Sequence, residues 1–389
     1  MLTICRKKTT FMRLNRTSIA LIVVLALSIS AYFIFIPNFE TQEFNLDTIA
    51  DISEGITTTI PNGSTNSESS NNLNSNNSSE ASGNKEIEII VEEGTEEELL
   101  EFNKSERIDG LFNAYLLIGS DKRSEASSLS RGFVEGQRAD VIILGLIGLE
   151  NDKSALISIP RDLLIKNSCT NKIERINASY NSNNCGNSAE NLAASVLNLT
   201  GISVKHFASF SFEGFEKIID SVGGIELCLE VSQREGYSFE LKKGCQLVSG
   251  EISLNWIVSR NTEELVGVKK IDKDGNDASD WKKMSGVSDL SRINRQQLVV
   301  VNLLNELKNF DSLGELTAFI NALEDAFIID EGLTNSQAAN ILWGIRGIES
   351  KNIQKLTIPT RSYETKQGAQ VLISTIKFYD FLVESDLLD

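Results

Sequence analysis

Three short apolar runs most strongly constrain the fold of this chain, at residues 115–118, 141–147 and 155–159. They are rich in Leu, Ile and Val and nearly continuous, which is typical of strands covered on both faces. An Arg/Asp cluster follows the first and third runs but precedes the second. If the middle strand is antiparallel to its neighbours, all three clusters lie at one rim of the sheet. The pattern therefore predicts a charged site at one edge of a β-sheet.

The three clusters consist of Asp121 with Arg123, Arg138 with Asp140, and Arg161 with Asp162. Carboxylates can hold a divalent cation and guanidiniums can clamp phosphate oxygens, so this rim suits a polyanion together with a metal. The alternative is that these residues form solvated surface pairs, which contribute little to stability. Three clusters in succession, with more arginines downstream, favour a binding site.

Further basic residues extend the pattern into the second half of the chain. Lys172 follows the third cluster, and Arg260 comes two residues after a short helical pattern at residues 250–258. Arg292, Arg295 and Gln296 share one turn of a predicted amphipathic helix at 291–310, where spacings of three and four residues place side chains on one face. Each arginine could simply pair with a nearby acid or with solvent, but together they could line a pocket for a diphosphate.

The composition excludes several classes of function. The formal net charge is -17 and the pI is about 4.7, so the surface as a whole repels nucleic acid. His206 is the single histidine, which argues against histidine metal sites and against most Ser–His triads. We expect His206 itself to be a packed or surface residue.

The N-terminal third predicts a membrane attachment. Residues 1–17 carry basic side chains and residues 18–37 form an apolar segment, close to the ~20 residues that span a bilayer as a helix. The charge pattern places the N-terminus in the cytoplasm and the remainder outside. A cleaved signal peptide is the competing interpretation, but the segment is long for one and lacks a small-residue cleavage site. Residues 38–110 read as a flexible Ser/Asn-rich and acidic linker.

Residues 111–389 alternate between strand and helix patterns, which predicts a three-layer α/β/α domain with a mixed central sheet. A polar stretch at 261–288 reads as a loop, and 369–387 as a terminal helix. Four cysteines follow the apolar segment, and an even number in an oxidising compartment indicates disulfides. Of the three possible connectivities, the simplest joins Cys169 to Cys185 and Cys228 to Cys245.

The order of these motifs resembles the LytR-CpsA-Psr family of bacterial envelope proteins. The resemblance covers residues 111 to the C-terminus and rests on segments 117–123, 138–140, 158–162, 172–178, 212–224, 247–251, 259–260 and 289–297. It implies a membrane-anchored phosphotransferase outside the cytoplasmic membrane, which moves a glycopolymer from a polyprenyl diphosphate carrier onto peptidoglycan.

The resemblance also implies roles for individual residues. Asp121 and Asp140 would hold Mg2+ (or Mn2+) against the diphosphate. Arg138, Arg161, Arg260 and Arg292 or Arg295 would clamp its oxygens, which guanidinium does bidentately, with Gln296 assisting by hydrogen bond. Arg123 and Lys172 would contact substrate, and Asp140 or Asp162 could accept the acceptor's proton. The prenyl tail would need an apolar slot between sheet and helices.

One departure from the family pattern bears on activity. The family usually has Arg-x-Arg-His where this chain has Val258-Ser259-Arg260-Asn261, so one expected clamp position is a valine. Two alternatives to the transferase therefore stay open. The first is a polyprenyl-diphosphate hydrolase with water as acceptor, and the second is a non-catalytic binder or regulator of lipid-linked polymers.

Overall fold

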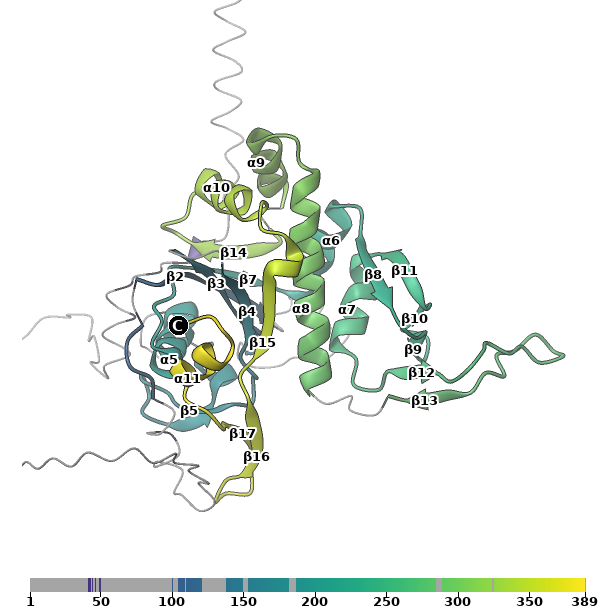
Figure 1. Cartoon of the computed structure of the whole chain (residues 1–389), viewed down its shortest axis with the longest axis horizontal. Helices are drawn as coiled ribbons and strands as arrows, with labels where there is room; N and C mark the ends of the chain where they lie inside the picture. Colours follow the sequence, from purple (N-terminus) through teal and green to yellow (C-terminus); the bar gives the residue numbers. More distant parts are fainter. Residues whose placement is uncertain are drawn as a thin grey trace, which may run out of the picture. The chain divides into compact units, whose positions relative to one another are not determined.

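The computed structural model (Figure 1) describes residues 41–42, 44, 46, 49, 100, 104–108, 110–120, 138–149, 153–181, 187–284, 289–323 and 325–388. The predicted membrane segment at 18–37 and most of the predicted linker lie outside these residues. Within the described part of the chain, no helix is both long and apolar enough to cross a membrane.

A seven-stranded mixed sheet forms the centre of the fold, in the order β1-β14-β7-β2-β3-β4-β15. β3 pairs antiparallel with both β2 and β4, whereas β7 runs parallel to β2 and β15 runs parallel to β4. The mixed sheet and the antiparallel middle strand are therefore confirmed. The strands are β1 (Thr41–Gln42), β2 (Phe112–Ser120), β3 (Ala139–Gly148), β4 (Ser154–Ser158), β7 (His206–Phe210), β14 (Phe327–Asp330) and β15 (Ile353–Thr357).

One face of this sheet is fully packed. Along β2, alternate residues such as Leu116 and Ile118 are completely buried, as the two-residue period of a strand requires. They form one core with α5 (Ser188–Thr200) and α11 (Phe378–Glu384). α5 begins with a capping box between Asn187 and Glu190, which satisfies backbone donors at its first turn.

The opposite face of the sheet is covered by a second set of helices but less completely. Val301 of α8 packs against Ile143 and Leu156 of the sheet. The β2 residues on this face, Tyr115 and Leu117 among them, are only partly buried. The helices are α6 (Phe212–Ser221), α7 (Gly250–Val258), α8 (Asp289–Glu306), α9 (Leu313–Ala322) and α10 (Asn335–Ile345). Helices thus lie on both faces of the sheet, as the three-layer prediction requires, and one layer leaves space beneath it.

Small sheets and single turns complete the described fold. They are the pairs β5 (Leu164–Lys166) with β6 (Ile173–Arg175), β8 (Ile225–Leu229) with β11 (Gly244–Val248), and β16 (Thr360–Glu364) with β17 (Gln370–Ser374), the sheet β10-β9-β12-β13 (Phe239–Leu241, Gln233–Glu235, Glu263–Leu265, Trp281–Lys283), and the 3-10 turns Ile176–Ser179, Leu307–Asn309 and Ser350–Asn352.

Two sequence predictions were wrong in this region. The stretch at 261–288, predicted as a loop, contains strands β12 and β13, and Arg234 of β9 binds Glu263 and Asp277 from it and lies over the Trp281 ring. Long-range ion pairing thus organises a segment whose local composition is that of a loop. The terminal helix predicted at 369–387 begins only at Phe378, because the preceding residues pair with β16 as β17.

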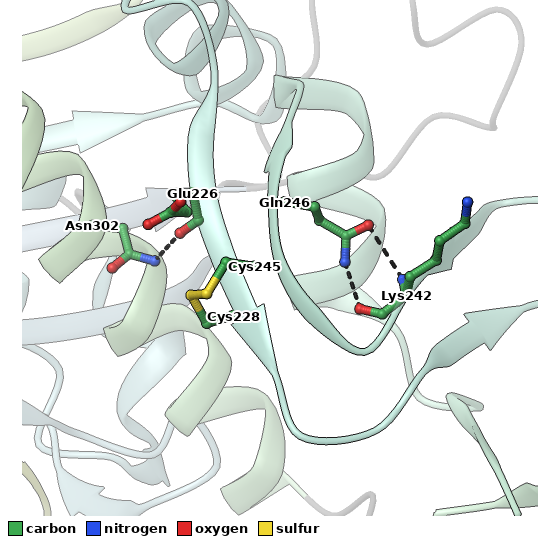
Figure 2. Close-up of a disulfide and its surroundings, with 6 residues drawn as sticks. All are labelled: Glu226, Cys228, Lys242, Cys245, Gln246 and Asn302. Carbon is green, nitrogen blue, oxygen red and sulfur yellow. Dashed lines mark hydrogen bonds between the residues drawn. A yellow bond between two sulfur atoms is a disulfide. The ribbon is translucent and has the colours of Figure 1, made fainter. Parts of the chain in front are cut away.

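The predicted disulfide between Cys228 and Cys245 is present (Figure 2), and the two residues lie directly opposite each other in the β8–β11 pair. Asn302 of α8 donates a hydrogen bond to the backbone oxygen of Glu226 at 2.7 Å, which ties this hairpin to the helix. Cys185 lies outside the described residues, so its pairing with Cys169 stays a prediction.

Replacing both Cys228 and Cys245 by serine should lower the free energy of unfolding by about 2–4 kcal/mol, because the disulfide closes a loop of intermediate length in the unfolded chain. Urea denaturation of the variant and the wild type measures the difference. A change below about 0.5 kcal/mol would contradict this role for the crosslink.

Candidate functional site

The antiparallel register brings two of the predicted clusters into contact. β3 begins at Ala139 and β4 ends at Ser158, so the start of one strand lies beside the end of the other. Beyond the ladder, the Ile159 backbone N–H still donates to the Ile142 oxygen at 2.9 Å. Arg161 then reaches Asp140, with 2.5 Å between guanidinium Nη1 and carboxylate Oδ1. This pair marks one rim of the sheet, as predicted.

Asp162 belongs to a chain of charges that continues away from that pair. Its carboxylate lies 3.5 Å from Arg161 Nε and 3.2 Å from Arg175 Nε. Arg175 also donates from Nη2 to the backbone oxygen of Gln370 at 2.8 Å. Asp162 therefore contacts both Arg161 and Arg175. Through Arg175 it links Arg161 to the hairpin of β16 and β17.

The rim opens into a large apolar cavity of about 490 Å³ between the incompletely covered sheet face and the helices α6 to α10. Its polar lining includes Asp140, Arg161, Arg260, Arg292 and Gln296, which come from β3, the segment after β4, the segment after α7, and α8. Most of the remaining lining is Leu, Ile, Val and Phe. Asp140, Arg161, Arg292 and Gln296 also line an adjoining hollow of about 20 Å³.

The electrostatics of the rim favour an anion. Burial, followed by the positive charges of Arg161 and Arg260, lowers the pKa of Arg292 to about 10, while the Asp140 carboxylate opposes the shift. Arg292 nevertheless stays charged at neutral pH. Among the described lining residues, three guanidiniums thus face one carboxylate at the rim. An entering polyanion would relieve their mutual repulsion.

Arg295, also on α8, makes contacts within the fold and not with the cavity. Arg295 is buried and donates to the backbone oxygens of Trp256 and Ser259 and to the Thr262 hydroxyl. Burial lowers its pKa to about 10. These partners occupy the guanidinium of Arg295, and Arg295 does not line the cavity. Its position therefore favours a role in attaching α8 to α7 over the predicted contact with phosphate.

Two further predicted site residues that the structure describes do not line the cavity. Arg138 is exposed directly before β3, and Lys172 is exposed before β6. Asp121 and Arg123 lie outside the described residues, so the predicted metal pair Asp121–Asp140 is described only at Asp140.

The cavity is also lined by residues that the sequence did not assign to the site. Val258, noted from the sequence only as a departure from the arginine that the resemblance implies, is 38% exposed and lines the cavity. His206 also lines it, and its Nδ1 lies 2.9 Å from the buried Asp330 carboxylate, so it is neither a plain core nor a surface histidine. The alternation of β2 and β7 residues could have placed Tyr115 and His206 on one face, but their side chains face a cavity only because the helices stand away from the sheet.

Comparison with known proteins assigns the chain to a family. The model of the LytR_cpsA_psr family matches residues 60–381. The chain belongs to the LytR-CpsA-Psr family. This confirms the resemblance deduced from the ordered motifs.

Several curated members of the LytR-CpsA-Psr family are similar to this chain. The cell wall biosynthesis protein LcpA of Corynebacterium glutamicum is 26% identical over 64% of this chain, but the match spans only 50% of LcpA. The regulatory protein MsrR of Staphylococcus aureus is 26% identical over 68% of this chain and 69% of its own length. The polyisoprenyl-teichoic acid–peptidoglycan teichoic acid transferase TagU of Bacillus licheniformis is 24% identical over 65% of this chain and 72% of its own length.

Solved structures confirm the fold. The LytR-Csp2A-Psr enzyme from Actinomyces oris superposes with a TM-score of 0.50 at 21% identity, over 72% of this chain and 96% of that enzyme. TagV of B. subtilis superposes with a TM-score of 0.52 at 17% identity, over 72% and 96%. The mixed α/β architecture is therefore that of the family.

Gln297 positions the rim residues of α8. Its buried amide Nε2 donates to the backbone oxygens of Leu156 and Leu356 and, at 2.9 Å, to the Ser158 hydroxyl, which attaches α8 to β4 and β15. The neighbouring Gln296 and the nearby Arg292 depend on this attachment for their place at the rim.

Gln297→Leu should lower the free energy of unfolding by about 1–3 kcal/mol, because it leaves buried acceptors without their donor. Urea denaturation measures this change. Asn309→Leu, at an exposed position of the turn after α8, is the matched control and should change the free energy by less than about 0.5 kcal/mol. Equal effects of the two variants would show that the Gln297 contacts contribute nothing.

Proposed function

We propose that this protein is a membrane-anchored phosphotransferase that moves a glycopolymer from a polyprenyl diphosphate carrier onto peptidoglycan. One observation carries the proposal: the charged rim of Asp140, Arg161, Arg260, Arg292 and Gln296 opens directly into a large apolar cavity. A diphosphate joined to a hydrocarbon chain is the kind of ligand that needs both surfaces at once. The description of the relative TagU as a polyisoprenyl-teichoic acid–peptidoglycan transferase supports the same chemistry.

The reaction needs positioning and charge stabilisation more than covalent help. An acceptor hydroxyl attacks the phosphorus next to the glycopolymer, a new P–O bond forms, and the phosphoanhydride bond breaks to release the prenyl monophosphate. Arg161, Arg260 and Arg292 hold the diphosphate oxygens and neutralise the charge that develops on the leaving phosphate. Gln296 adds a neutral hydrogen bond, and Asp140 or Asp162 accepts the proton of the acceptor hydroxyl.

A divalent cation, Mg2+ or Mn2+, fits this donor set. Magnesium is commonly held by one or two carboxylates together with substrate phosphate oxygens, and Asp140 supplies a carboxylate at the rim. Asp121 is proposed as the second. When bound, the ion would neutralise charge on the diphosphate. The described grouping of Glu226 with Cys228 and Cys245 does not suit a metal, because the two sulfurs are joined to each other.

The predicted membrane anchor at residues 18–37 would keep the domain close to both proposed substrates. A lipid-linked donor is confined to the bilayer, and peptidoglycan is assembled just outside it. Tethering the domain to the same membrane raises the effective concentration of donor at the rim. The proposed location is therefore the cell membrane, with the N-terminus cytoplasmic and the domain outside.

Arg161→Ala should lower the rate of transfer by about 10²–10³-fold, because it removes a guanidinium from the developing charge. The assay uses the full-length chain, Mg2+, a prenyl-diphosphate-linked oligosaccharide and peptidoglycan fragments, and detects oligosaccharide attached to glycan. Arg361→Ala, an exposed arginine of β16, is the matched control and should transfer at the wild-type rate. Unchanged transfer by the Arg161 variant would remove that residue from the diphosphate site.

A non-catalytic binder is the second candidate, and the position of Val258 favours it. This valine lines the cavity at the position where the resemblance implies an arginine, so the rim has one guanidinium fewer than the family pattern implies. The relative MsrR is described as a regulatory protein. Binding of the lipid-linked donor without any turnover would support this candidate, whereas release of free polymer phosphate would indicate a hydrolase.

Val258→Arg separates these possibilities further. If the chain is a transferase with a weakened clamp, the added guanidinium should raise transfer by about tenfold, equivalent to roughly one charge-assisted hydrogen bond. The same assay, with Val258→Met as a control of similar bulk but no charge, measures this gain. A decrease with arginine but not with methionine would show that an apolar side chain is required at the rim.

A further inference from the structure

The floor of the cavity is built in three rows across the sheet. The register pairs Gly119 of β2 with Val141 of β3 and with Phe210 of β7, and this row lies next to Asp140 at the charged rim. Leu117, Ile143 and Ala208 form the second row. All six residues line the cavity. The floor is therefore apolar from the rim inward.

The third row changes in character. It consists of Tyr115 with Gly145 on one side and His206 on the other, and all three residues line the cavity. The Tyr115 and His206 rings stack with their centres 6.2 Å apart. Asp330, which is buried, lies 2.9 Å from His206 Nδ1 and holds the imidazole in place. Two polar rings thus end the apolar floor on β2 and β7, whereas on β3 and β4 the lining continues to Ile147 and Ser154.

The distance from the first row to the third is about 13 Å, because four residues of strand separate Gly119 from Tyr115. A hydrocarbon chain that enters at the rim gains binding energy from each apolar row that it covers. At the third row it would have to strip water from a phenol and an imidazole without replacing their hydrogen bonds, which is unfavourable.

We propose that Tyr115 and His206, together with Gly145 of the adjacent strand β3, set the length of prenyl tail that the cavity holds. A tail that lies along β2 and β7 contributes to binding up to the third row, and additional isoprene units gain no further apolar contact on that path. This inference rests on the proposed function, because it takes a prenyl diphosphate as the ligand, and it adds the residues that limit how deep the tail is bound.

Two substitutions should shift this limit in opposite directions. Tyr115→Ala removes the ring and opens the end of the floor, so longer tails should gain affinity. Gly145→Val should shorten the limit, since a Cβ at this position would meet its nearest neighbours at ordinary distances of 3.6–4.0 Å and the branches would extend into the cavity. Tyr115→Phe removes only the hydroxyl and separates polarity from size.

The test measures dissociation constants of geranyl, farnesyl and geranylgeranyl diphosphate by titration calorimetry, with the full-length chain in lipid nanodiscs and Mg2+. In the wild type, affinity should rise with tail length and then level off. Tyr115→Ala should extend the rise to the next longer tail by about tenfold in affinity, and Gly145→Val should end it one tail earlier. Lys205→Ala, exposed beside the third row, is the control and should keep the wild-type profile.

These variants leave the His206–Asp330 pair intact, so they avoid an unpaired buried carboxylate, and thermal unfolding checks that each variant folds. An identical length profile in all variants would overturn the inference, even if the wild type transfers glycopolymer. If no prenyl diphosphate binds better than pyrophosphate and no transfer occurs, both the inference and the proposed function fail.

Discussion

The antiparallel placement of β3 between β2 and β4 is the constraint on which the candidate site depends. It puts the first residues of β3 beside the last residues of β4, so that Asp140 and Arg161 meet although twenty residues of chain separate them. If β3 and β4 were parallel, the start of β3 and the end of β4 would lie at opposite ends of the strands, and Asp140 and Arg161 would be far apart. The ion pair is partly exposed and contributes little stability by itself. Its importance lies in fixing where a guanidinium stands at the rim.

The two faces of the sheet differ in how completely helices cover them. α5 and α11 fill one face with close-packed side chains, and this core accounts for much of the buried apolar surface. On the other face, α8 is attached to β4 and β15 through Gln297, while α9 and α10 stand far enough away to leave the cavity. A cavity lined by Leu, Ile and Phe lowers the stability of the fold, because the lining side chains lack packing partners. An apolar ligand that fills the cavity would restore those contacts.

The rim combines a low-polarity surrounding with an excess of positive charge, in a chain that is strongly acidic overall. Burial and neighbouring guanidiniums both disfavour the charged form of Arg292, yet an arginine retains its proton under these conditions. The repulsion is therefore stored in the free protein and is relieved when an anion binds. An apolar cavity directly behind this rim suits the proposed ligand, an anion that carries a hydrocarbon chain.

Much of the fold follows from local patterns in the sequence. The continuous apolar runs predicted the strands β2, β3 and β4, and the helical patterns at 250–258 and 291–310 predicted α7 and α8 near their observed positions. The strands β12 and β13 lie in a polar stretch, and β17 lies in a stretch that was predicted as helix. All three were missed because pairing with another strand, rather than composition, decides their conformation.

The sequence alone also determined which residue types gather at the rim. The Arg/Asp clusters adjoin the ends of strands, so their positions are set by where those strand ends lie in the sheet. The tertiary structure decided which of them face the cavity. Arg292 and Arg295 are three residues apart on α8, and only Arg292 lines the cavity, because Arg295 is drawn against Trp256 of α7. The rotation of a helix about its axis depends on such packing partners, and so does the gap between helix and sheet that turns one face of β2 into the floor of a cavity.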